Sequence, residues 1–327
     1  MPCGGGEAKA MTNKRKSSYS KFEKKDFLFV YLLIALPVLQ FAVFWFYVNI
    51  SSFTLAFKDP AGSWTFDNFR QVWYGLTHAD QYGTNILTMI LRSFTLWFIS
   101  NCVVFPIALC TTYVLFRRVF GHYVFRVIYM LPSLIGGVVW IATMKQLLSN
   151  YGAVVYFMKK AGASISGSVM SDGLMYDVKT AFPTLCLTVF IYGIAGGNAV
   201  VTGAYSRIPE ELFDVGKLDG IGFWREFFNV CLPCIWPTVS TLLTFSLCTI
   251  FVGEGNVFLY TNGEGGYGLD TMGFYIQYLV YRLSLTSSEK MPYGYPAAIG
   301  LFITLITLPI VLVGRRILES LVEAVET

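Results

Sequence analysis

A polar interruption divides two long apolar segments of the chain and reads Ile208-Pro-Glu-Glu-Leu-Phe-Asp-Val-Gly-Lys-Leu-Asp-Gly-Ile-Gly-Phe-Trp-Arg-Glu-Phe-Phe-Asn-Val-Cys-Leu-Pro233. Pro209 suits the first position of a helix, and Glu210 and Glu211 favour the positive N-terminal end of the helix dipole. Gly220 can end this helix in a left-handed conformation. The sequence therefore predicts a short, rigid helix at the end of a membrane span, which a partner protein can grip.

Each of two expected short helices in this interruption has an apolar face. In the first helix, Leu212, Val215 and Gly216 share a face, because residues three and four apart lie on the same side. The second helix is expected along the inner membrane surface, with one stripe formed by Phe223, Phe227 and Val230. An alternative interpretation is an amphipathic loop helix that rests on lipid.

The composition indicates a membrane protein. Of 327 residues, 55% are hydrophobic, 17% aromatic and only 13% charged, and the mean hydropathy is +0.56. A helix needs roughly 20 apolar residues to cross about 30 Å of hydrocarbon. The sequence predicts an all-α polytopic protein with six transmembrane helices, over residues 27–50, 86–116, 124–144, 182–201, 236–252 and 295–313.

The distribution of Lys and Arg predicts the orientation, because positively charged loops stay in the cytoplasm. One side holds fifteen of them, in the tail up to Lys25 and at residues 117–126, 207–225 and 315–316, whereas the other side holds eight. Both termini are therefore expected in the cytoplasm. The basic tail is interpreted as a topology signal and not as a nucleic-acid site.

The expected organisation has three parts. Residues 1–26 form a basic cytoplasmic tail, residues 27–316 form the transmembrane domain with its coupling loop at 203–233, and residues 317–327 form a cytoplasmic C-terminal tail. The first apolar run is too long for a cleavable signal peptide and lacks a small-residue cleavage site, so we expect it to remain as a span.

The sequence offers little catalytic chemistry. Gly216 and Lys217 lack the earlier Gly and the following Ser or Thr of a phosphate-binding loop, so we expect no ATP site on this chain. Cys231 and Cys234 have redox or zinc spacing without a second pair, which favours two small apolar residues near a helix start. A membrane enzyme is the weakest alternative, and we expect no metal.

The interruption resembles the EAA motif of permease subunits of binding-protein-dependent ABC importers, in the carbohydrate-uptake branch. That motif reads Ile-Pro-x-Glu-Leu-x-Glu-Ala-Ala-x-x-Asp-Gly-Ala and is followed by Ile-x-Leu-Pro. The matching residues here are Ile208 to Leu212, Asp214-Val215-Gly216, Asp219-Gly220-Ile221 and Val230 to Pro233. The sequence departs from it with Asp214 for Glu and Val215-Gly216 for Ala-Ala. Further similarity lies at residues 64–69, at residues 131–140 and at Gly152, so the resemblance runs from about Phe27 to Arg316.

The resemblance implies the ABC type I importer permease fold and the partners of such a subunit. These are a cytoplasmic ATPase dimer that binds ATP and Mg, a second permease that is distinct in this branch, and an extracytoplasmic solute-binding protein, in a bacterial inner membrane. It implies that the chain binds no cofactor of its own and is no enzyme. The residues that it assigns to ATPase coupling are Glu210, Glu211, Leu212, Asp214, Val215, Gly216, Asp219 and Gly220.

The cargo implied by this branch is a sugar or oligosaccharide. Aromatic rings stack on sugar faces, and the candidates along the substrate path are Trp140, Tyr192, Tyr275 and Tyr278, although packing alone explains aromatic residues in spans. Arg92 stands in the second span without an obvious partner, where a cation is costly. It either lines a cavity or extends to the surface; if it lines the path, an acidic oligosaccharide such as an alginate or pectin fragment is favoured, and the chain loosely resembles an alginate-importer permease.

A glycine cluster in the fourth span allows two interpretations. Gly193 and Gly197 are four residues apart, the spacing that lets two membrane helices pack closely. Alternatively, Gly196, Gly197 and Asn198 unwind the helix and expose backbone groups to the cargo.

A self-sufficient secondary carrier or channel remains the alternative function. It requires paired intramembrane charges or an inverted repeat, and we identify neither in the sequence. Co-purification with a cytoplasmic ATPase would distinguish the two functions.

We predict that disruption of Asp219 or Gly220 leaves the protein folded in the membrane but abolishes transport, because the motif match places both at the docking loop. The measurement is substrate uptake together with capture of the ATPase. Mutants that still capture the ATPase and transport at the wild-type rate would show that the docking site is assigned wrongly.

Overall fold

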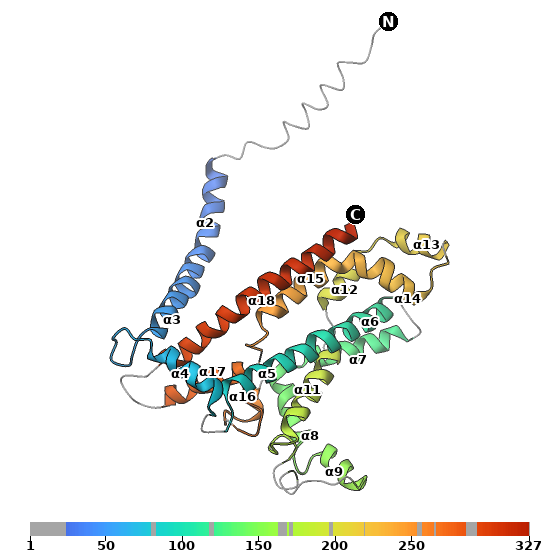
Figure 1. Cartoon of the computed structure of the whole chain (residues 1–327). Helices are drawn as coiled ribbons and strands as arrows, with labels where there is room; N and C mark the ends of the chain where they lie inside the picture. The colour runs from blue at the N-terminus through green and yellow to red at the C-terminus, as the bar shows by residue number, and fades with distance from the viewer. Residues whose placement is uncertain are drawn as a thin grey trace. The chain divides into compact units, whose positions relative to one another are not determined.

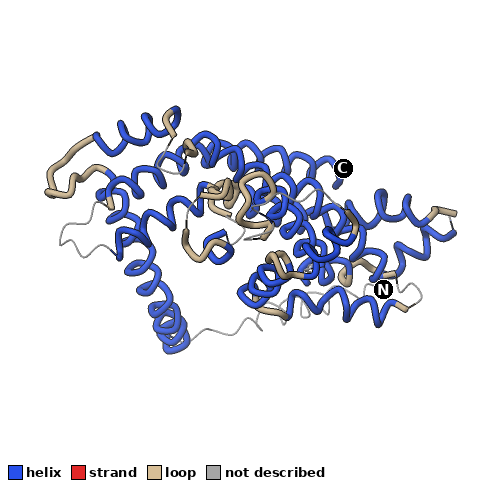
Figure 2. The backbone as a smooth tube through the Cα atoms, turned by 90° about the horizontal axis from the view of Figure 1, so that it is seen from below, coloured by secondary structure: helices blue, strands red, loops and turns tan. Residues whose placement is uncertain are grey.

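The computed structural model describes residues 24–79, 83–117, 121–162, 169, 173–195, 199–218, 220–253, 257–264, 266–285 and 293–326. Within these residues the chain is helical, and its one β-bridge pairs Lys58 with Trp64. Figure 2 shows helices and loops throughout the described chain. The absence of strands fits a lipid-embedded chain, since helices satisfy every backbone group within one segment.

The chain divides into two compact units, residues 1–54 and 55–327. The first unit contains α2 (Lys24–Phe41) and the π-helical segment η1 (Ala42–Tyr47), and α3 (Val48–Ala56) begins in it. The remaining helices of the described chain are α4 (Asp67–Thr77), α5 (Ile86–Phe98), η2 (Ile99–Val104), α6 (Phe105–Phe116), α7 (His122–Leu134), α8 (Gly137–Leu147), α9 (Ala153–Lys160), α11 (Ala181–Ala195), α12 (Ala199–Tyr205), α13 (Glu210–Leu218), α14 (Phe223–Glu226), η3 (Phe227–Cys231), α15 (Leu232–Cys248), α16 (Val257–Tyr260), α17 (Met272–Leu285) and α18 (Gly294–Glu326).

The helix of the first unit is apolar on all sides. Its described side chains up to Thr54 are exposed or nearly so, including Phe29, Leu36 and Phe44. A helix that is hydrophobic all round is suited to lipid or to another membrane helix. Residues 1–23, which contain most of the expected basic tail, lie outside the described residues.

Four helical stretches of the described chain are long and apolar enough to cross a membrane: Phe29–Ala56, Ile86–Phe116, Phe223–Cys248 and Gly294–Leu321. They correspond to the first, second, fifth and sixth predicted spans. The last helix, α18, continues to Glu326, so the described part of the expected C-terminal tail is a helical extension. Helices α15 and α18 lie side by side (Figure 1).

The third and fourth predicted spans are not single long helices. Helix α7 ends at Leu134 and α8 starts at Gly137, because Ile135 and Gly136 adopt extended backbone angles. Two adjacent glycines at this point make continued helix costly. The fourth region consists of the shorter apolar helix α11 and of α12, and residues 196–198, including Asn198, lie outside the described residues.

The fifth span begins earlier than predicted and absorbs the second surface helix. Helix α14, the π-helical turn η3 and α15 form one stretch from Phe223 to Cys248, which ends before the predicted Val252. Of the expected stripe of Phe223, Phe227 and Val230, Phe227 is buried, Val230 is half-buried and Phe223 is exposed. Glu226 and Cys231 are also buried at this end. The expectation of a separate surface helix was wrong because Glu226, a charged residue that suggests a surface position, forms an ion pair inside the protein.

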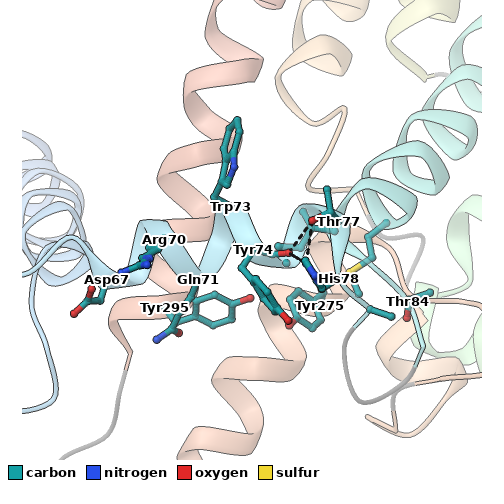
Figure 3. Close-up of a pocket in the computed structure, with 14 residues that line it drawn as sticks. Asp67, Arg70, Gln71, Trp73, Tyr74, Thr77, His78, Thr84, Tyr275 and Tyr295 are labelled. Atoms are coloured by element: carbon teal, nitrogen blue, oxygen red, sulfur yellow. Dashed lines mark hydrogen bonds between the residues drawn. The ribbon is translucent and has the colours of Figure 1, made fainter.

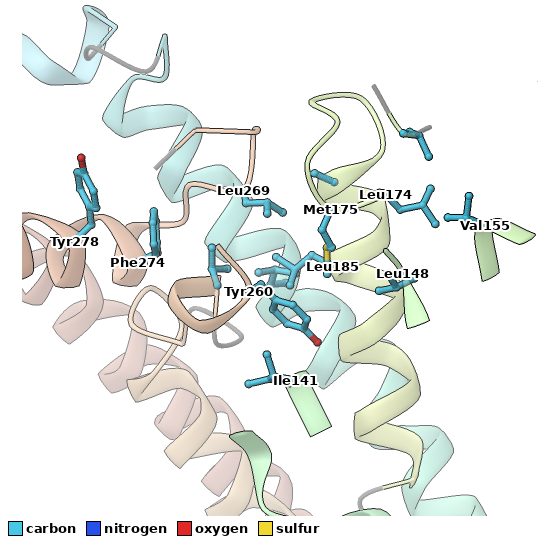
Figure 4. Close-up of a cluster of buried hydrophobic side chains, with 14 residues drawn as sticks. Ile141, Leu148, Val155, Leu174, Met175, Leu185, Tyr260, Leu269, Phe274 and Tyr278 are labelled. Carbon is cyan, nitrogen blue, oxygen red and sulfur yellow. The ribbon is translucent and has the colours of Figure 1, made fainter. Parts of the chain in front are cut away.

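Three hydrophobic clusters hold the second unit together. The first joins α8, α9, α11, α16 and α17 around Leu185, Tyr260 and Phe274 (Figure 4). The second joins α4, α5, α17 and α18. The third, around Tyr113, Tyr205 and Phe213, joins α6, α12, α13 and the α14–α15 helix. The predicted docking helix is therefore part of a packed core.

Gly193 of α11 allows close packing against the second span. A Cβ atom at this position would lie 2.5 Å from Cγ1 of Val104, a β-branched side chain that is itself buried. Val104 has little rotamer freedom to move aside. The packing interpretation is supported at Gly193, whereas Gly197 lies outside the described residues.

We predict that Gly193→Ala lowers the thermal unfolding temperature in detergent, because overpacking costs about 1–3 kcal/mol. Gly203→Ala is the matched control, since a Cβ atom there meets nothing within 4 Å, and it gains helix propensity without a clash. The second substitution Val104→Ala should restore stability to Gly193→Ala. Equal effects of the two glycine substitutions would contradict the packing role.

Candidate functional site

Helix α13 is anchored by one buried aromatic ring and leaves an apolar edge exposed. Phe213 is 4% exposed and packs in the third cluster, whereas Leu212, Val215 and Leu218 are exposed, Leu218 to 88%. Gly216 is buried on the Phe213 side. Within the expected face of Leu212, Val215 and Gly216, the two side chains are exposed and the glycine is buried.

The ends of α13 follow the predicted signals. The helix begins at Glu210, one residue after Pro209, and carries Glu210 and Glu211 in its first turn. Gly220 has a φ of +68°, and the N–H of Ile221 donates to the Gly216 carbonyl at 3.0 Å. Only glycine adopts this backbone without strain. Glu210, Glu211 and Asp214 are exposed, and Asp219 lies outside the described residues.

A buried ionic cluster lies beside α13. The Glu226 carboxylate on α14 is 3.0 Å from Nε of Arg117, accepts a hydrogen bond from Arg117 Nη2 at 3.0 Å, and accepts another from the Tyr113 hydroxyl at 2.8 Å. The guanidinium carbon of Arg117 lies 4.9 Å from the centre of the Phe213 ring. The sequence analysis missed these four residues, because Arg117 was counted as a topology charge and Glu226 as part of a surface helix.

Arg92 has a partner, contrary to the sequence-based expectation. Its Nη1 lies 3.9 Å from Oδ2 of Asp270, which also accepts a hydrogen bond from the Thr84 hydroxyl at 3.2 Å. The Gly266 N–H donates to Oδ1 of Asp270 at 3.0 Å. Burial raises the pKa of the Asp270 carboxyl above its ordinary value, although Gly266, Arg92 and Thr84 each lower it. The pair is a loose one, because the buried Nη1 of Arg92 has no hydrogen-bond partner.

The aromatic candidates for the substrate path do not gather in one place. Trp140 on α8 and Tyr192 on α11 contact each other, with ring centres 5.4 Å apart. Tyr275 and Tyr278 are buried on α17, in the second and the first cluster respectively. The structure thus brings two of the four rings together and uses the other two in packing.

A cavity of about 440 Å³ lies between the second span, α11 and α15. Polar atoms meet in its wall: Nε1 of Trp97 donates to the Ser246 carbonyl at 2.9 Å, and the Asn101 amide donates to the Trp97 carbonyl at 2.9 Å. Ser100 and Thr249 also line it. The sequence analysis missed this cavity, which combines an indole ring with hydroxyl and amide groups and therefore offers both stacking and hydrogen bonding.

A larger hollow of about 840 Å³ opens beside α4. Its lining includes Arg70, Tyr74, His78, Tyr275 and Tyr295. Figure 3 shows Tyr74 and Trp73 on opposite sides of α4, with Tyr74 directed towards the tyrosines of α17 and α18. The Tyr74 and His78 rings, which both line the hollow, stack at 3.7 Å between centres.

Known proteins resemble the chain in sequence and fold, although no protein-family model matches it. The arabinooligosaccharides transport system permease protein AraP of Bacillus subtilis (strain 168) is 23% identical over 299 residues, which cover 89% of this chain and 88% of AraP. The maltose/maltodextrin permease protein MalF of Shigella flexneri is 25% identical over 205 residues, 60% of this chain and 38% of MalF. The aligned part thus spans less than half of MalF and most of AraP.

A solved structure has the same fold. A chain of a bacterial ABC transporter involved in import of the acidic polysaccharide alginate superimposes with a TM-score of 0.71 at 23% identity, over 91% of this chain and 96% of that chain. The chain is therefore an all-α, multi-pass membrane protein with the fold of an ABC importer permease. The resemblance to carbohydrate ABC importer permeases is confirmed by these relatives. Permease subunits of this class are transport components without catalytic activity, and they need no cofactor of their own.

Proposed function

We propose that the chain is the transmembrane permease subunit of an ATP-driven, binding-protein-dependent importer for a sugar or oligosaccharide. In this proposal a separate cytoplasmic ATPase dimer docks on residues 208–222. The observation that carries it is α13, a short helix with motif-like ends whose Phe213 is fixed in the core while Leu212, Val215 and Leu218 stay exposed. A helix so built transmits force from a partner, because its inner face is part of the packed core.

The proposed mechanism is alternating access. Nucleotide binding closes the ATPase dimer, moves the docked helices together and tips the spans from inward-facing to outward-facing. Reversal of a 1:99 population requires about 5.5 kcal/mol of differential binding, which nucleotide and the loaded binding protein supply together. The proposal includes six spans, both termini in the cytoplasm, a second, distinct permease subunit and a bacterial inner membrane. The fold likeness and the names of the relatives support it.

The proposed cargo path passes the cavity beside Trp97. Its indole ring and the polar groups of Asn101 and Ser246, which are bonded to one another in this structure, would provide the stacking and hydrogen bonds that a sugar needs. Trp140 and Tyr192 extend the aromatic surface on α8 and α11. The alternative of a secondary carrier requires paired charges in the membrane, and Arg92 with Asp270 is the pair that would have to serve it.

An acidic oligosaccharide is the finer form of the proposal. The solved alginate importer supports it by its fold, and a periplasmic protein carrying an alginate pentasaccharide is part of a related structure. On this chain Arg92 is the residue that an acidic sugar would contact. Its Nη1 lies 3.9 Å from Asp270 and has no hydrogen-bond partner, so in the proposal an opening at this buried position would bring a cargo carboxylate to it.

We predict that the complete transporter hydrolyses ATP faster when the binding protein carries sugar, which is measured with the purified complex in proteoliposomes.

A cysteine at Val215 should cross-link to the ATPase, whereas one at Leu305, an exposed residue of α18, should not. A chain that transports without any ATPase would support the secondary carrier instead. Equal cross-linking from both positions would contradict docking on α13.

We predict that the paired substitution Arg92→Gln with Asp270→Asn reduces uptake of uronic-acid oligosaccharides more than uptake of neutral ones. The pair is removed together because a single change leaves the other charge buried and unpaired, which costs stability. The matched control Arg315→Gln with Glu319→Gln removes an exposed ion pair of α18 and should leave the ratio of the two uptakes unchanged. Uptake of both sugars in an unchanged ratio by the double variant would exclude Arg92 from cargo selection.

A further inference from the structure

Glu226 is an acidic residue enclosed by protein at the start of a membrane-spanning helix. The residue is 3% exposed, and each carboxylate oxygen lies 3.0 Å from a nitrogen of the Arg117 guanidinium. The Tyr113 hydroxyl donates to Oε1 at 2.8 Å. Two parallel contacts between a planar guanidinium and a carboxylate fix orientation as well as distance.

The contacts of this pair connect three parts of the fold. Tyr113 and Arg117 belong to the C-terminal end of the second span, while Glu226 belongs to the first turn of the fifth. On its other side, Arg117 contacts the ring of Phe213, the buried anchor of α13. The Phe116 ring lies 5.9 Å from the same Phe213 ring. A displacement of α13 therefore acts on both spans through one group of side chains.

The second span and the fifth are also connected through the backbone. The Tyr113 hydroxyl lies 3.1 Å from the Phe223 carbonyl and donates towards it as well as towards Glu226. The Tyr113 ring packs against Phe223 and Phe227, at 4.8 Å and 5.1 Å between ring centres. These contacts lie at the N-terminal end of the fifth span, next to the loop that follows α13. A motion of α13 would therefore reach the membrane-spanning helices at this point.

Stability alone does not account for a buried ion pair at this position. Apolar residues of similar volume commonly replace such a pair without loss of stability, because both charges must be removed from water. What apolar packing does not reproduce is the fixed bidentate geometry of guanidinium and carboxylate. The described chain offers a contrast in Arg315 and Glu319 on α18, a pair at 2.7 Å that is 60% and 56% exposed.

We propose that Glu226, Arg117 and Tyr113 are positioning residues that transmit the movement of α13 to the second and fifth spans. The proposal rests on the proposed function of α13 as the ATPase docking helix. These residues contact neither nucleotide nor cargo in this role. They hold Phe213 in a defined place, so that a push on α13 moves the spans and does not merely bend the loop.

The test uses the paired substitution Glu226→Met with Arg117→Met in the complete transporter, reconstituted in proteoliposomes. Removal of both charges avoids a buried unpaired charge and should leave the unfolding temperature close to that of the wild type. We expect the ATPase to remain bound and the amount of sugar transported per ATP hydrolysed to fall at least about tenfold, the usual scale of a lost coupling. Tyr113→Phe should give a smaller decrease.

The matched control is Glu319→Ala with Arg315→Ala, which removes an ion pair on the exposed face of α18 and should leave the transport ratio unchanged. A double methionine variant that folds and transports at the wild-type ratio would overturn the positioning role. Failure of the wild-type complex to bind any ATPase would instead overturn the proposed function of α13. The two failures are thus distinguishable in one set of preparations.

Discussion

The whole architecture follows from the requirement that backbone groups in lipid form their hydrogen bonds within the protein. A helix meets this requirement within one segment, and the described residues outside the loops are accordingly helical. The interruptions of the α-helices differ in burial, since Gly136 is exposed whereas Phe227 and Cys231 are buried. The break at Ile135 and Gly136 precedes α8, which packs in the first hydrophobic cluster through Ile141. The π-helical turn η3 lies in the third cluster, where Phe227 and Cys231 are buried.

Two ion pairs with buried carboxylates lie at opposite ends of the second span. Arg92 near its start pairs with Asp270, and Arg117 just beyond its end pairs with Glu226. The two pairs differ in geometry. The first has one contact at 3.9 Å and an Nη1 without a hydrogen bond, whereas the second has two contacts at 3.0 Å. The loose pair can exchange its partner, whereas the bidentate pair holds its neighbours in place. An arginine–carboxylate pair thus serves a different purpose at each end of the second span.

The helix α13 links these features to transport. Its buried side is continuous with the packed interior through Phe213, Phe116 and Tyr205, whose rings are in contact. Its exposed side is apolar at Leu212, Val215 and Leu218, an unusual composition for a surface that faces water. Rigid inner packing and an apolar outer edge are the two properties that a docking element needs. Of the three departures from the motif, Asp214 and Val215 lie on the exposed side, whereas Gly216 is buried beside the anchor Phe213.

The sequence by itself determined the membrane class, the four long spans and the ends of α13, because apolar length, Pro209 and Gly220 act through local physics. Only the tertiary structure decided that Glu226 belongs inside a span, that Arg92 faces Asp270, and that Trp97, Asn101 and Ser246 share a cavity. Each of these facts depends on residues more than a hundred positions apart in the chain. From the sequence alone a charged residue is interpreted as a surface residue, because its partner comes close only when distant helices pack together.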